Sequence, residues 1–575
     1  MVNTNVFRIQ DDQAYASWIE EFDEIRDDQI KSIKCRVESL SSTLRIAVVP
    51  LAASASSGEL IQFKRMLESQ IYPHWHICFQ DNIDLDDASL VPCTAGSLAA
   101  LISQAALTAD FVLPLPLDAI LPPQALAHFV LTLSEIPDAD IIYADEDVLR
   151  GKIRSQPSFK TDWDPLLILG SNFVGIPALY RAQAIQRAQP EELCEKACAT
   201  DNLLHALTLR VSSTSSSERI LHIPSILAHR SKLPEWSGDQ ARHIVSSHLA
   251  SLGLGTIEVR PAPLDSKWNR VSFPLPTPAP SVSIIVPTRD RADLISACVT
   301  GILNRTDYPS FELIIVDNGT KAPDALAIIE SFKCDNRVRV LRDDRPFNYS
   351  RLNNYAVTTA RSDILVLLNN DVEILHDDWL TELVSLASYP GIGVAGTKLL
   401  YPDLRIQHAG VTFGPDSTIQ HQMRLASRND PGPGGALALI RSVSAVTGAC
   451  LAIRREIYIK VGGLNEERLR VAYNDIDLCR KVARLGLSIV WTPFVELVHH
   501  ESISRGQAST PEKAGRDSAE SIAFWSMNRD LYEFPDPFHN PQIHFQNDCV
   551  DFARPPRPHR FRHLRNQERY VAFLY

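Results

Sequence analysis

A cluster of polar side chains at residues 369–371 follows an apolar run and has the composition of a cation site. Residues 365–368 are leucine and valine, which predicts a buried parallel strand. In open α/β sheets, ligands bind outside the carboxyl ends of the strands. Asp371 therefore stands where a carboxylate could hold Mg²⁺ or Mn²⁺, and such an ion can bind a diphosphate. A polar turn after a buried strand has the same pattern, so this run alone leaves both interpretations open.

A second carboxylate, Asp475, precedes a predicted helix over residues 476–485. The N-terminus of a helix keeps a carboxylate ionised, which suits a general base that takes a proton from a hydroxyl group. Acid pairs also occur in first turns for capping alone, and Asp477 fits that explanation better than Asp475 does. His499 ends a strand-like run, and only one of His499 and His500 can face a metal, because strand side chains alternate. An imidazole ligand favours Mn²⁺ over Mg²⁺.

Two strand-like runs, beginning at Leu44 and Ser281, each open a region in which strand and helix patterns alternate. This alternation predicts an α/β fold with mostly parallel sheets covered by helices. The proline-rich residues 273–280 predict a stiff connection between the two regions. We expect a helical segment at 1–43, a first α/β domain at 44–265, a linker at 266–280, a second α/β domain at 281–545 and a basic tail at 546–575.

The two regions repeat the same order of features, which indicates two copies of one unit. Val49-Pro50 matches Val286-Pro287, Asp81 matches Asp317, Asp118 matches Asp371, Asp201 matches Asp475 and His229 matches His499. The first copy departs in the strand before Asp118, which contains Pro114 and Pro116. Proline lacks the N–H that a central strand needs, so we expect this strand to be disturbed.

The composition fits a globular protein and excludes one broad class. The chain has 575 residues, of which 45% are hydrophobic and 22% charged. A net charge of −12 argues against a general nucleic-acid binder. No apolar run reaches the roughly 18 residues that cross a bilayer, and the first residues do not resemble a secretory signal. We therefore expect a cytoplasmic protein with reduced thiols.

The ordered motifs of the second region resemble family 2 glycosyltransferases with the GT-A fold, of the rhamnosyltransferase-like type in bacterial surface polysaccharides. The runs that carry the resemblance are 284–290, 314–319, 347–354, 367–371, 406–410, 445–450, 473–479 and 497–506. The first region resembles the same family more loosely, through 141–147, 159–163 and 221–230. The resemblance implies tandem GT-A domains. It also implies inverting transfer of a sugar from a nucleotide-diphospho-sugar to a hydroxyl group of a growing cell-surface glycan, such as an O-antigen or exopolysaccharide.

The resemblance also implies a role for each matching residue. Asp475 would be the general base, and Asp371 and His499 would bind a Mn²⁺ or Mg²⁺ ion. The nucleotide-sugar would lie against Pro287, Thr288, Arg289, Asp317, Asn353, Asn354, Asn370 and Asp371. The acceptor, or a loop beside it, would involve Gln407, His408, Asn474 and Arg505. The family usually shows Asp-x-Asp, whereas Asn369 takes the first position here, and an amide binds a hard cation less well than a carboxylate does.

The first region is interpreted as a degenerate copy, kept for acceptor binding or as a scaffold. Its vestigial counterparts of the site are Asp81, Asp118, Asp201 and His229. Two alternatives stay open, namely a bifunctional transferase with both copies active and a non-catalytic carbohydrate-binding scaffold. The acceptor is expected to be lipid-linked, at the inner face of the cell membrane, where the basic tail could touch the lipid. The donor sugar, its nucleotide, the linkage and the oligomeric state leave no signal in the sequence.

Overall fold

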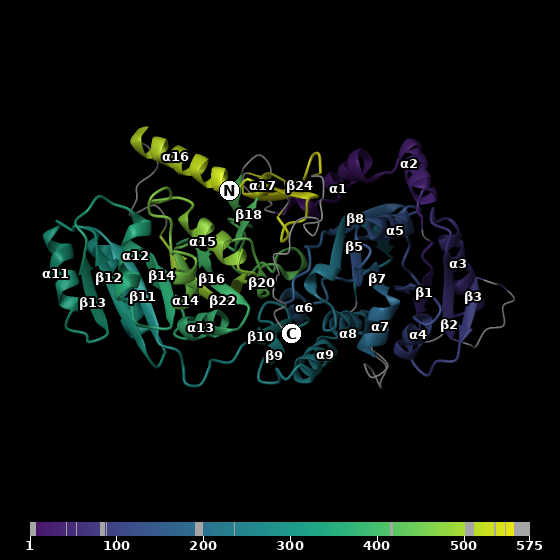
Figure 1. Ribbon diagram of the computed structural model, residues 1–575, viewed down its shortest axis with the longest axis horizontal. Helices are drawn as coiled ribbons and strands as arrows, with labels where there is room; N and C mark the ends of the chain where they lie inside the picture. Colours follow the sequence, from purple (N-terminus) through teal and green to yellow (C-terminus); the bar gives the residue numbers. More distant parts are fainter. Residues whose placement is uncertain are drawn as a thin grey trace.

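The computed structural model describes residues 7–41, 43–52, 55–80, 87, 89–189, 199–234, 236–414, 418–500, 511–533, 536–546 and 548–556. They form two α/β lobes that lie side by side, one on an eight-stranded sheet and one on a ten-stranded sheet (Figure 1). We call residues 44–272 the N-lobe and residues 281–500 the C-lobe. The predicted α/β class, with large mostly parallel sheets and covering helices, is confirmed.

The elements follow one another in the order that strand and helix patterns predict. The N-lobe contains β1 (Ile46–Leu51), α3 (Ser57–Glu68), β2 (Trp75–Gln80), β3 (Leu90–Cys93), α4 (Leu98–Ala105), β4 (Phe111–Pro116), α5 (Ala125–Glu135), β5 (Ile141–Arg150), β6 (Ile153–Ser158), α6 (Leu167–Gly170), β7 (Ala178–Arg181), α7 (Ala182–Ala188), α8 (Thr200–Ser212), η4 (Ser217–Arg219), β8 (Ile220–Arg230), α9 (Gly238–Ser251), β9 (Glu258–Pro261) and β10 (Asn269–Ser272).

The C-lobe contains β11 (Val282–Thr288), α10 (Ala292–Asn304), β12 (Phe311–Asp317), α11 (Pro323–Phe332), β13 (Val338–Arg342), α12 (Tyr349–Thr359), β14 (Ile364–Leu368), β15 (Val372–Ile374), α13 (Trp379–Ser388), β16 (Ile392–Leu400), β17 (Ile406–His408), β18 (Val411–Phe413), β19 (Ile419–His421), η6 (Pro433–Gly435), β20 (Arg441–Ser442), β21 (Cys450–Arg454), α14 (Arg455–Lys460), α15 (Asn474–Ala483) and β22 (Ser488–His499). Outside the lobes lie η1 (Arg8–Gln10), α1 (Asp12–Trp18), η2 (Ile19–Asp23), α2 (Asp27–Glu38), α16 (Pro511–Met527), α17 (Asp530–Glu533), β23 (Ile543–Gln546) and β24 (Cys549–Phe552).

Both sheets have the same strand order, which shows that the lobes are two copies of one topology. The N-lobe order is β3-β2-β1-β4-β7-β5, and both β8 and β6 pair with β5. The C-lobe order is β13-β12-β11-β14-β21-β16, and both β22 and β17 pair with β16. Directions also correspond, since β1–β4 and β11–β14 are parallel while β4–β7 and β14–β21 are antiparallel. The repeat predicted from the sequence is therefore a repeat of structure.

Alternate residues of the central strand β11 enter two different cores. Ile284 belongs to the cluster that contains buried residues of α10 and α13, whereas Ile285 belongs to the cluster with α12 and α15. Successive strand side chains point to opposite faces, so helices cover both sides of the sheet. Every residue of β14 is buried, as expected of a central strand in such a sheet. The polar turn after β14 is thereby held at the carboxyl edge.

The prolines of β4 are tolerated with shorter pairing on one side. β4 pairs with β1 along its whole length, but with β7 only through Phe111 and Val112. The corresponding strand β14 pairs with β21 through all of its residues, from Ile364 to Leu368. Pro114 and Pro116 have no N–H to donate, which accounts for the shortened ladder. The predicted disturbance is thus local, and the strand itself remains central.

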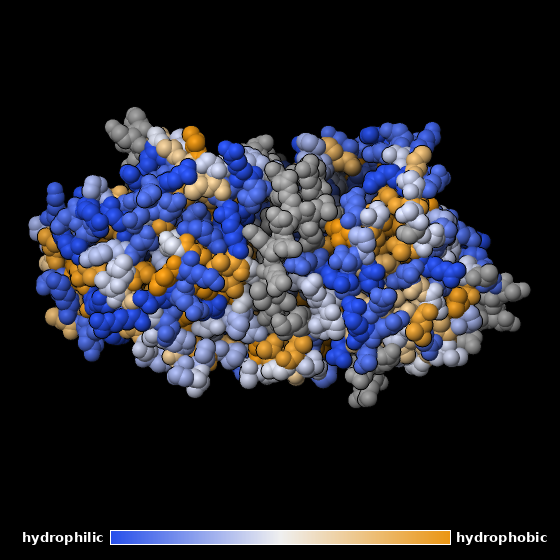
Figure 2. Space-filling model, in the orientation of Figure 1, coloured by the Kyte–Doolittle hydropathy of each residue, from blue (hydrophilic) through white to orange (hydrophobic). Residues whose placement is uncertain are grey.

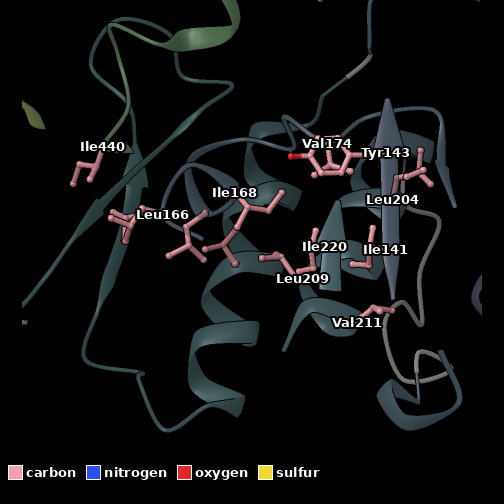
Figure 3. Packing of buried hydrophobic residues seen from close by; sticks show 14 of the residues in the cluster. Ile141, Tyr143, Leu166, Ile168, Val174, Leu204, Leu209, Val211, Ile220 and Ile440 are labelled. Carbon is pink, nitrogen blue, oxygen red and sulfur yellow. The ribbon is translucent and has the colours of Figure 1, made fainter. Parts of the chain in front are cut away.

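Buried contacts join the two lobes. The carboxylate of Asp164 accepts hydrogen bonds from the main-chain N–H of Ser442 at 2.7 Å and from its hydroxyl group at 3.0 Å. Ile440 of the C-lobe belongs to the same hydrophobic cluster as Leu166 and the N-lobe core (Figure 3). Leu439 is fully buried in a smaller cluster that residues of both lobes form. The lobes therefore share a core.

The two ends of the described chain meet over the N-lobe, where α1 and β24 lie near each other (Figure 1). Phe7 forms a bridge with Val550. The ring of Trp18 stacks on Phe552 with centroids 5.6 Å apart, and its indole N–H donates to the carbonyl of Ala553 at 3.2 Å. The segments before and after the lobes are thus one structural unit in space.

The visible face of the molecule shows hydrophobic residues in scattered groups among hydrophilic ones (Figure 2). In the part of the chain that the structure describes, no helix combines the length and the apolar character needed to cross a membrane. The eight cysteines recorded within the described ranges are all free thiols.

Replacing Leu439 with alanine should lower the free energy of unfolding by about 2–5 kcal/mol, because tightly packed neighbours cannot fill the cavity. Leu439 is fully buried with Leu167 and Trp268 at the junction of the lobes. Leu404→Ala is a matched control, since Leu404 is 43% exposed and should change stability by less than about 0.5 kcal/mol. Urea unfolding of the full chain measures both variants. Equal losses would contradict a role for Leu439 in joining the lobes.

Candidate functional site

Asp371 and His499 lie side by side because the strands that carry them are paired. After β14 ends at Leu368 the chain turns, and β15 runs antiparallel to the end of β22 with Val372 opposite His499. The Asp371 Oδ1 and His499 Nε2 atoms are 3.1 Å apart, and 3% and 12% of the two side-chain surfaces are exposed. The main-chain N–H of His500 donates to the carbonyl of Asp371 at 3.0 Å. The predicted pair is therefore assembled by strand pairing.

The imidazole of His499 faces an oxygen atom on each side. Its Nδ1 lies 2.7 Å from Gln407 Oε1, and its Nε2 lies near Asp371 Oδ1 and 3.2 Å from the amide nitrogen of Asn369. A neutral imidazole has one N–H, so donation from Nδ1 leaves a lone pair on Nε2 that points at a carboxylate. A second proton or a cation satisfies that contact.

The spacing of this pair fits one divalent ion. Two ligands at right angles on an ion with bonds of about 2.1 Å are about 3.0 Å apart. The observed separation of Asp371 Oδ1 and His499 Nε2 is 3.1 Å. Over the described ranges, no cluster of three or more His, Cys, Asp or Glu side chains forms a metal centre by itself. The residues present can therefore act as two of several ligands.

Asp475 lies in the first turn of α15 and reaches the same edge of the sheet. Its Oδ2 accepts a hydrogen bond from the main-chain N–H of Gly448 at 2.8 Å. The N–H of Asn369 donates to the carbonyl of the next residue, Ala449, at 3.0 Å. These bonds link the turn after β14 to the start of α15. Asp475 is half-buried, whereas Asp477 is buried and ion-paired within the helix, so Asp475 is the acid that a hydroxyl group can approach.

Thr288, Asp317 and Asn370 meet at the ends of parallel strands. Thr288 lies opposite Asp317 in the β11–β12 pair, and the Asn370 amide donates to the Thr288 hydroxyl at 3.0 Å. Asp317 accepts from the N–H of Thr320 at 2.8 Å and forms an ion pair with Arg342 of β13. Arg342 is 44% exposed and was not among the predicted residues, since nothing in the sequence distinguishes it from other strand arginines. The structure adds it to this edge.

Three predicted asparagines hold the local backbone instead. Asn353 is fully buried and donates within α12. Asn354 donates to the carbonyl of Leu464 at 2.9 Å and so secures the loop after α14. Asn474 donates to the carbonyl of Val471 at 3.0 Å. The structure does not bring these amides to the edge where Asp371 lies.

The other predicted residues have different surroundings. His408 is buried with its Nδ1 2.8 Å from Nδ1 of His421, and burial, together with that neighbour, lowers the pKa of His408 well below its usual value. Pro287 is a buried residue of β11. Arg289, on the loop after β11, has 49% of its side-chain surface exposed and is open to a ligand. Arg505 lies outside the described residues.

The N-lobe keeps the histidine of the pair but not the carboxylate. His229 pairs with Ile120 as the C-lobe histidine pairs with the first residue of β15. The residue before Ile120 is Ala119, which therefore stands at the position of Asp371. Asp118 is one position earlier, exposed, and hydrogen-bonded to a serine hydroxyl. Strand register thus shifts the predicted match by one residue.

His229 is held in a buried network instead. Its Nδ1 lies 2.5 Å from Asp147 Oδ1, while Asp147 Oδ2 accepts from the Tyr15 hydroxyl at 2.7 Å and from Arg154 at 2.6 Å. Arg154 also pairs with Asp23 at 2.6 Å. Burial by itself would raise the pKa of Asp147, but His229 and Arg154 outweigh it and hold that pKa below its usual value. The N-terminal segment therefore completes this network.

The counterpart of the candidate base is also neutralised in the N-lobe. Asp201, in the first turn of α8, is 6% exposed and lies 2.9 Å from the guanidinium of Arg230, which also pairs with Glu146. Asp475 has no such cation recorded beside it in the described structure. Asp81 lies outside the described residues.

Comparison with known proteins gives a family and two long relatives. Residues 278–518 match the family model described as glycosyltransferase like family 2. The chain is 36% identical over 550 residues to the uncharacterized protein y4gI of Sinorhizobium fredii, covering 89% of this chain and 59% of that protein. It is 33% identical over 542 residues to the O-antigen biosynthesis protein RfbC of Myxococcus xanthus, covering 88% of this chain and 41% of that protein. The chain thus spans about half the length of these relatives.

Among solved structures, a mannosyltransferase from Pyrobaculum calidifontis in complex with GDP-Man and Mn²⁺ shows a weak likeness. The match covers 43% of this chain and 65% of that chain, with 18% sequence identity and a TM-score of 0.33.

Removing the Tyr15 hydroxyl should loosen the N-terminal segment. Tyr15→Phe leaves the buried carboxylate of Asp147 without one donor, which costs about 1–3 kcal/mol. Hydrogen exchange followed by mass spectrometry should show faster exchange in peptides that cover residues 12–23. Tyr532→Phe is the matched control, because Tyr532 is 60% exposed. Unchanged exchange in Tyr15→Phe would contradict the role assigned to this network.

Proposed function

Residues 278–518 form a domain of glycosyltransferase-like family 2, and from that premise we propose that this chain transfers a sugar from a nucleotide-diphospho-sugar to a hydroxyl group of a growing cell-surface glycan. The observation that carries the proposal is the placement of Asp371, His499 and Asp475 along one edge of the C-lobe sheet. The similarity to an O-antigen biosynthesis protein over most of the chain supports the glycan class.

In the proposed reaction, Asp475 acts as the general base. The acceptor hydroxyl loses its proton to the Asp475 carboxylate while its oxygen attacks the anomeric carbon. The new carbon–oxygen bond forms as the bond from that carbon to the diphosphate breaks, and the nucleoside diphosphate leaves. Attack from the face opposite the diphosphate inverts the anomeric centre. The position of Asp475 at a helix N-terminus supports this role, because the helix favours its ionised form.

The donor would lie along the carboxyl ends of β11, β12 and β14. Thr288, Asp317 and Asn370 border the nucleotide in this arrangement, while Asp371 and His499 hold a divalent ion, with Mn²⁺ favoured by the imidazole. The ion would supply positive charge that stabilises the departing diphosphate. The 3.1 Å separation of the Asp371 and His499 ligand atoms supports this assignment.

The N-lobe, in our proposal, no longer transfers sugar and supports the C-lobe. Ala119 replaces the carboxylate of the ion-binding pair, and Arg230 neutralises Asp201. The bond from Asp164 to Ser442 holds the C-lobe segment that leads to the active-site edge. These observations favour one active centre over a bifunctional enzyme. They leave the N-lobe surface available for binding the acceptor.

A lipid-linked acceptor at the cytoplasmic face of the cell membrane would suit this reaction. The proposal places the basic C-terminal residues 546–575 near anionic lipid head groups, which attract lysine and arginine side chains. The chain would then contact the membrane peripherally.

Asp475→Asn should lower donor turnover by about 10²–10⁴-fold, because the amide cannot take the proton of the acceptor hydroxyl. The assay detects nucleoside diphosphate released from a panel of nucleotide sugars, including dTDP-rhamnose, in the presence of Mn²⁺ and a membrane extract as acceptor. Donor binding should persist in this variant, which shows that the fold is intact.

Asp118→Asn is the matched control, since Asp118 lies on the exposed turn of the N-lobe. It should leave turnover unchanged. Turnover that survives Asp475→Asn would overturn the base assignment. Donor binding without any turnover in the wild-type chain, whatever the acceptor, would favour the carbohydrate-binding scaffold.

A further inference from the structure

Gln407 holds His499 at two points. Its Oε1 lies 2.7 Å from the ring Nδ1, and its amide nitrogen donates to the His499 carbonyl at 3.2 Å. We propose that Gln407 is a positioning residue, which fixes the orientation and protonation of His499 toward a divalent ion, and does not contact the glycan acceptor. This inference rests on the proposed function, which places an ion at Asp371 and His499.

A β-bulge sets the direction of the Gln407 side chain. In the antiparallel pair of β16 and β17, Leu399 lies opposite His408 and Leu400 lies opposite Ile406. Gln407 is therefore an extra residue without a partner across the pair. Bulges bend a strand and re-aim a side chain, and they are frequent beside active sites. Gln407 is 5% exposed, so its amide is directed into the protein.

The end of β16 brings this bulge close to the histidine. β16 pairs with β17 on one side and with β22 on the other, so a single strand separates Gln407 from His499. A glutamine side chain is long enough to span that strand spacing, and the two hydrogen bonds show that it does so.

The two contacts determine which amide atom faces the ring. A main-chain carbonyl can only accept a hydrogen bond, so the Gln407 nitrogen must face it and the amide oxygen must face Nδ1 of His499. Nδ1 then carries the proton, and Nε2 keeps a lone pair directed toward Asp371 Oδ1. A metal-binding histidine commonly donates its other ring N–H to such an acceptor, which fixes the tautomer and the ring orientation.

The N-lobe contains the same arrangement with a charged acceptor. There Asp147 Oδ1 lies 2.5 Å from Nδ1 of His229, and the same carboxylate binds Tyr15 and Arg154. A carboxylate stabilises a second proton on the imidazole, whereas the neutral amide of Gln407 does so much less. The comparison separates a histidine that is available to a cation from one that is consumed by an internal network.

The test measures Mn²⁺ affinity directly, because activity alone would not distinguish positioning from acceptor binding. Gln407→Met keeps the side-chain length without the amide and should weaken Mn²⁺ binding by about 10–100-fold. Gln407→Glu retains an oxygen acceptor for Nδ1 and should restore most of the affinity. Gln420→Met, the same change at a half-buried position of β19, should leave the affinity unchanged. Mn²⁺ is titrated into the full chain with excess UDP or dTDP, and the electron paramagnetic resonance signal reports the free ion.

The outcomes separate this inference from the proposed function. Wild-type Mn²⁺ affinity in Gln407→Met, with a raised KM for the acceptor, would overturn the positioning role. Failure of the wild-type chain to bind Mn²⁺ would overturn it as well. Weakened binding in Gln407→Met in a chain that never transfers sugar would refute the proposed function and support the inference. Should Gln407→Met fail to fold, Gln407→Ser makes the same comparison.

Discussion

The antiparallel pairing of β15 with the last residues of β22 is the contact on which the candidate site depends. It brings Asp371 to 3.1 Å from His499, although the two residues are far apart in the sequence. The same pairing holds one end of the turn at 369–371, while β14 holds the other. The turn can therefore present Asn370 to Thr288 and the N–H of Asn369 to the strand that precedes β21. Each of these bonds restrains the edge that Asp475 also reaches.

The two lobes share a topology and differ in their charges. In the N-lobe, the acids and bases at the corresponding edge are satisfied by one another, His229 by Asp147 and Asp201 by Arg230. Burial would raise the pKa of Glu146, but Arg230 and Lys160 hold it below its usual value. A buried charge that loses its partner is strongly destabilising, which gives such a network a structural reason to persist. The same residues that would bind a ligand in one copy stabilise the other.

The junction connects the supporting lobe to the active-site edge. Asp164 accepts two hydrogen bonds from Ser442, and its burial raises the pKa of its carboxyl group, although those bonds oppose the shift. Ser442 belongs to β20, which pairs with β22 opposite Trp491 and Val490. The strand that carries His499 is therefore braced from the N-lobe side. The shared core around Leu439 makes the lobes one unit in which this bracing can be transmitted.

The sequence by itself determined the α/β class, the internal repeat, and the places of Asp371, Asp475 and His499 at the ends of strands or the start of a helix. These features follow from local periodicity and from the polar residues that interrupt it, which a linear pattern records. Tertiary structure decided the rest. The bulge that aims Gln407, the outward turn of Asn354 toward Leu464, and the register that equates Ala119 with Asp371 all depend on contacts between distant segments. Strand register and side-chain partners are set by packing across the sheet, and no local pattern encodes them.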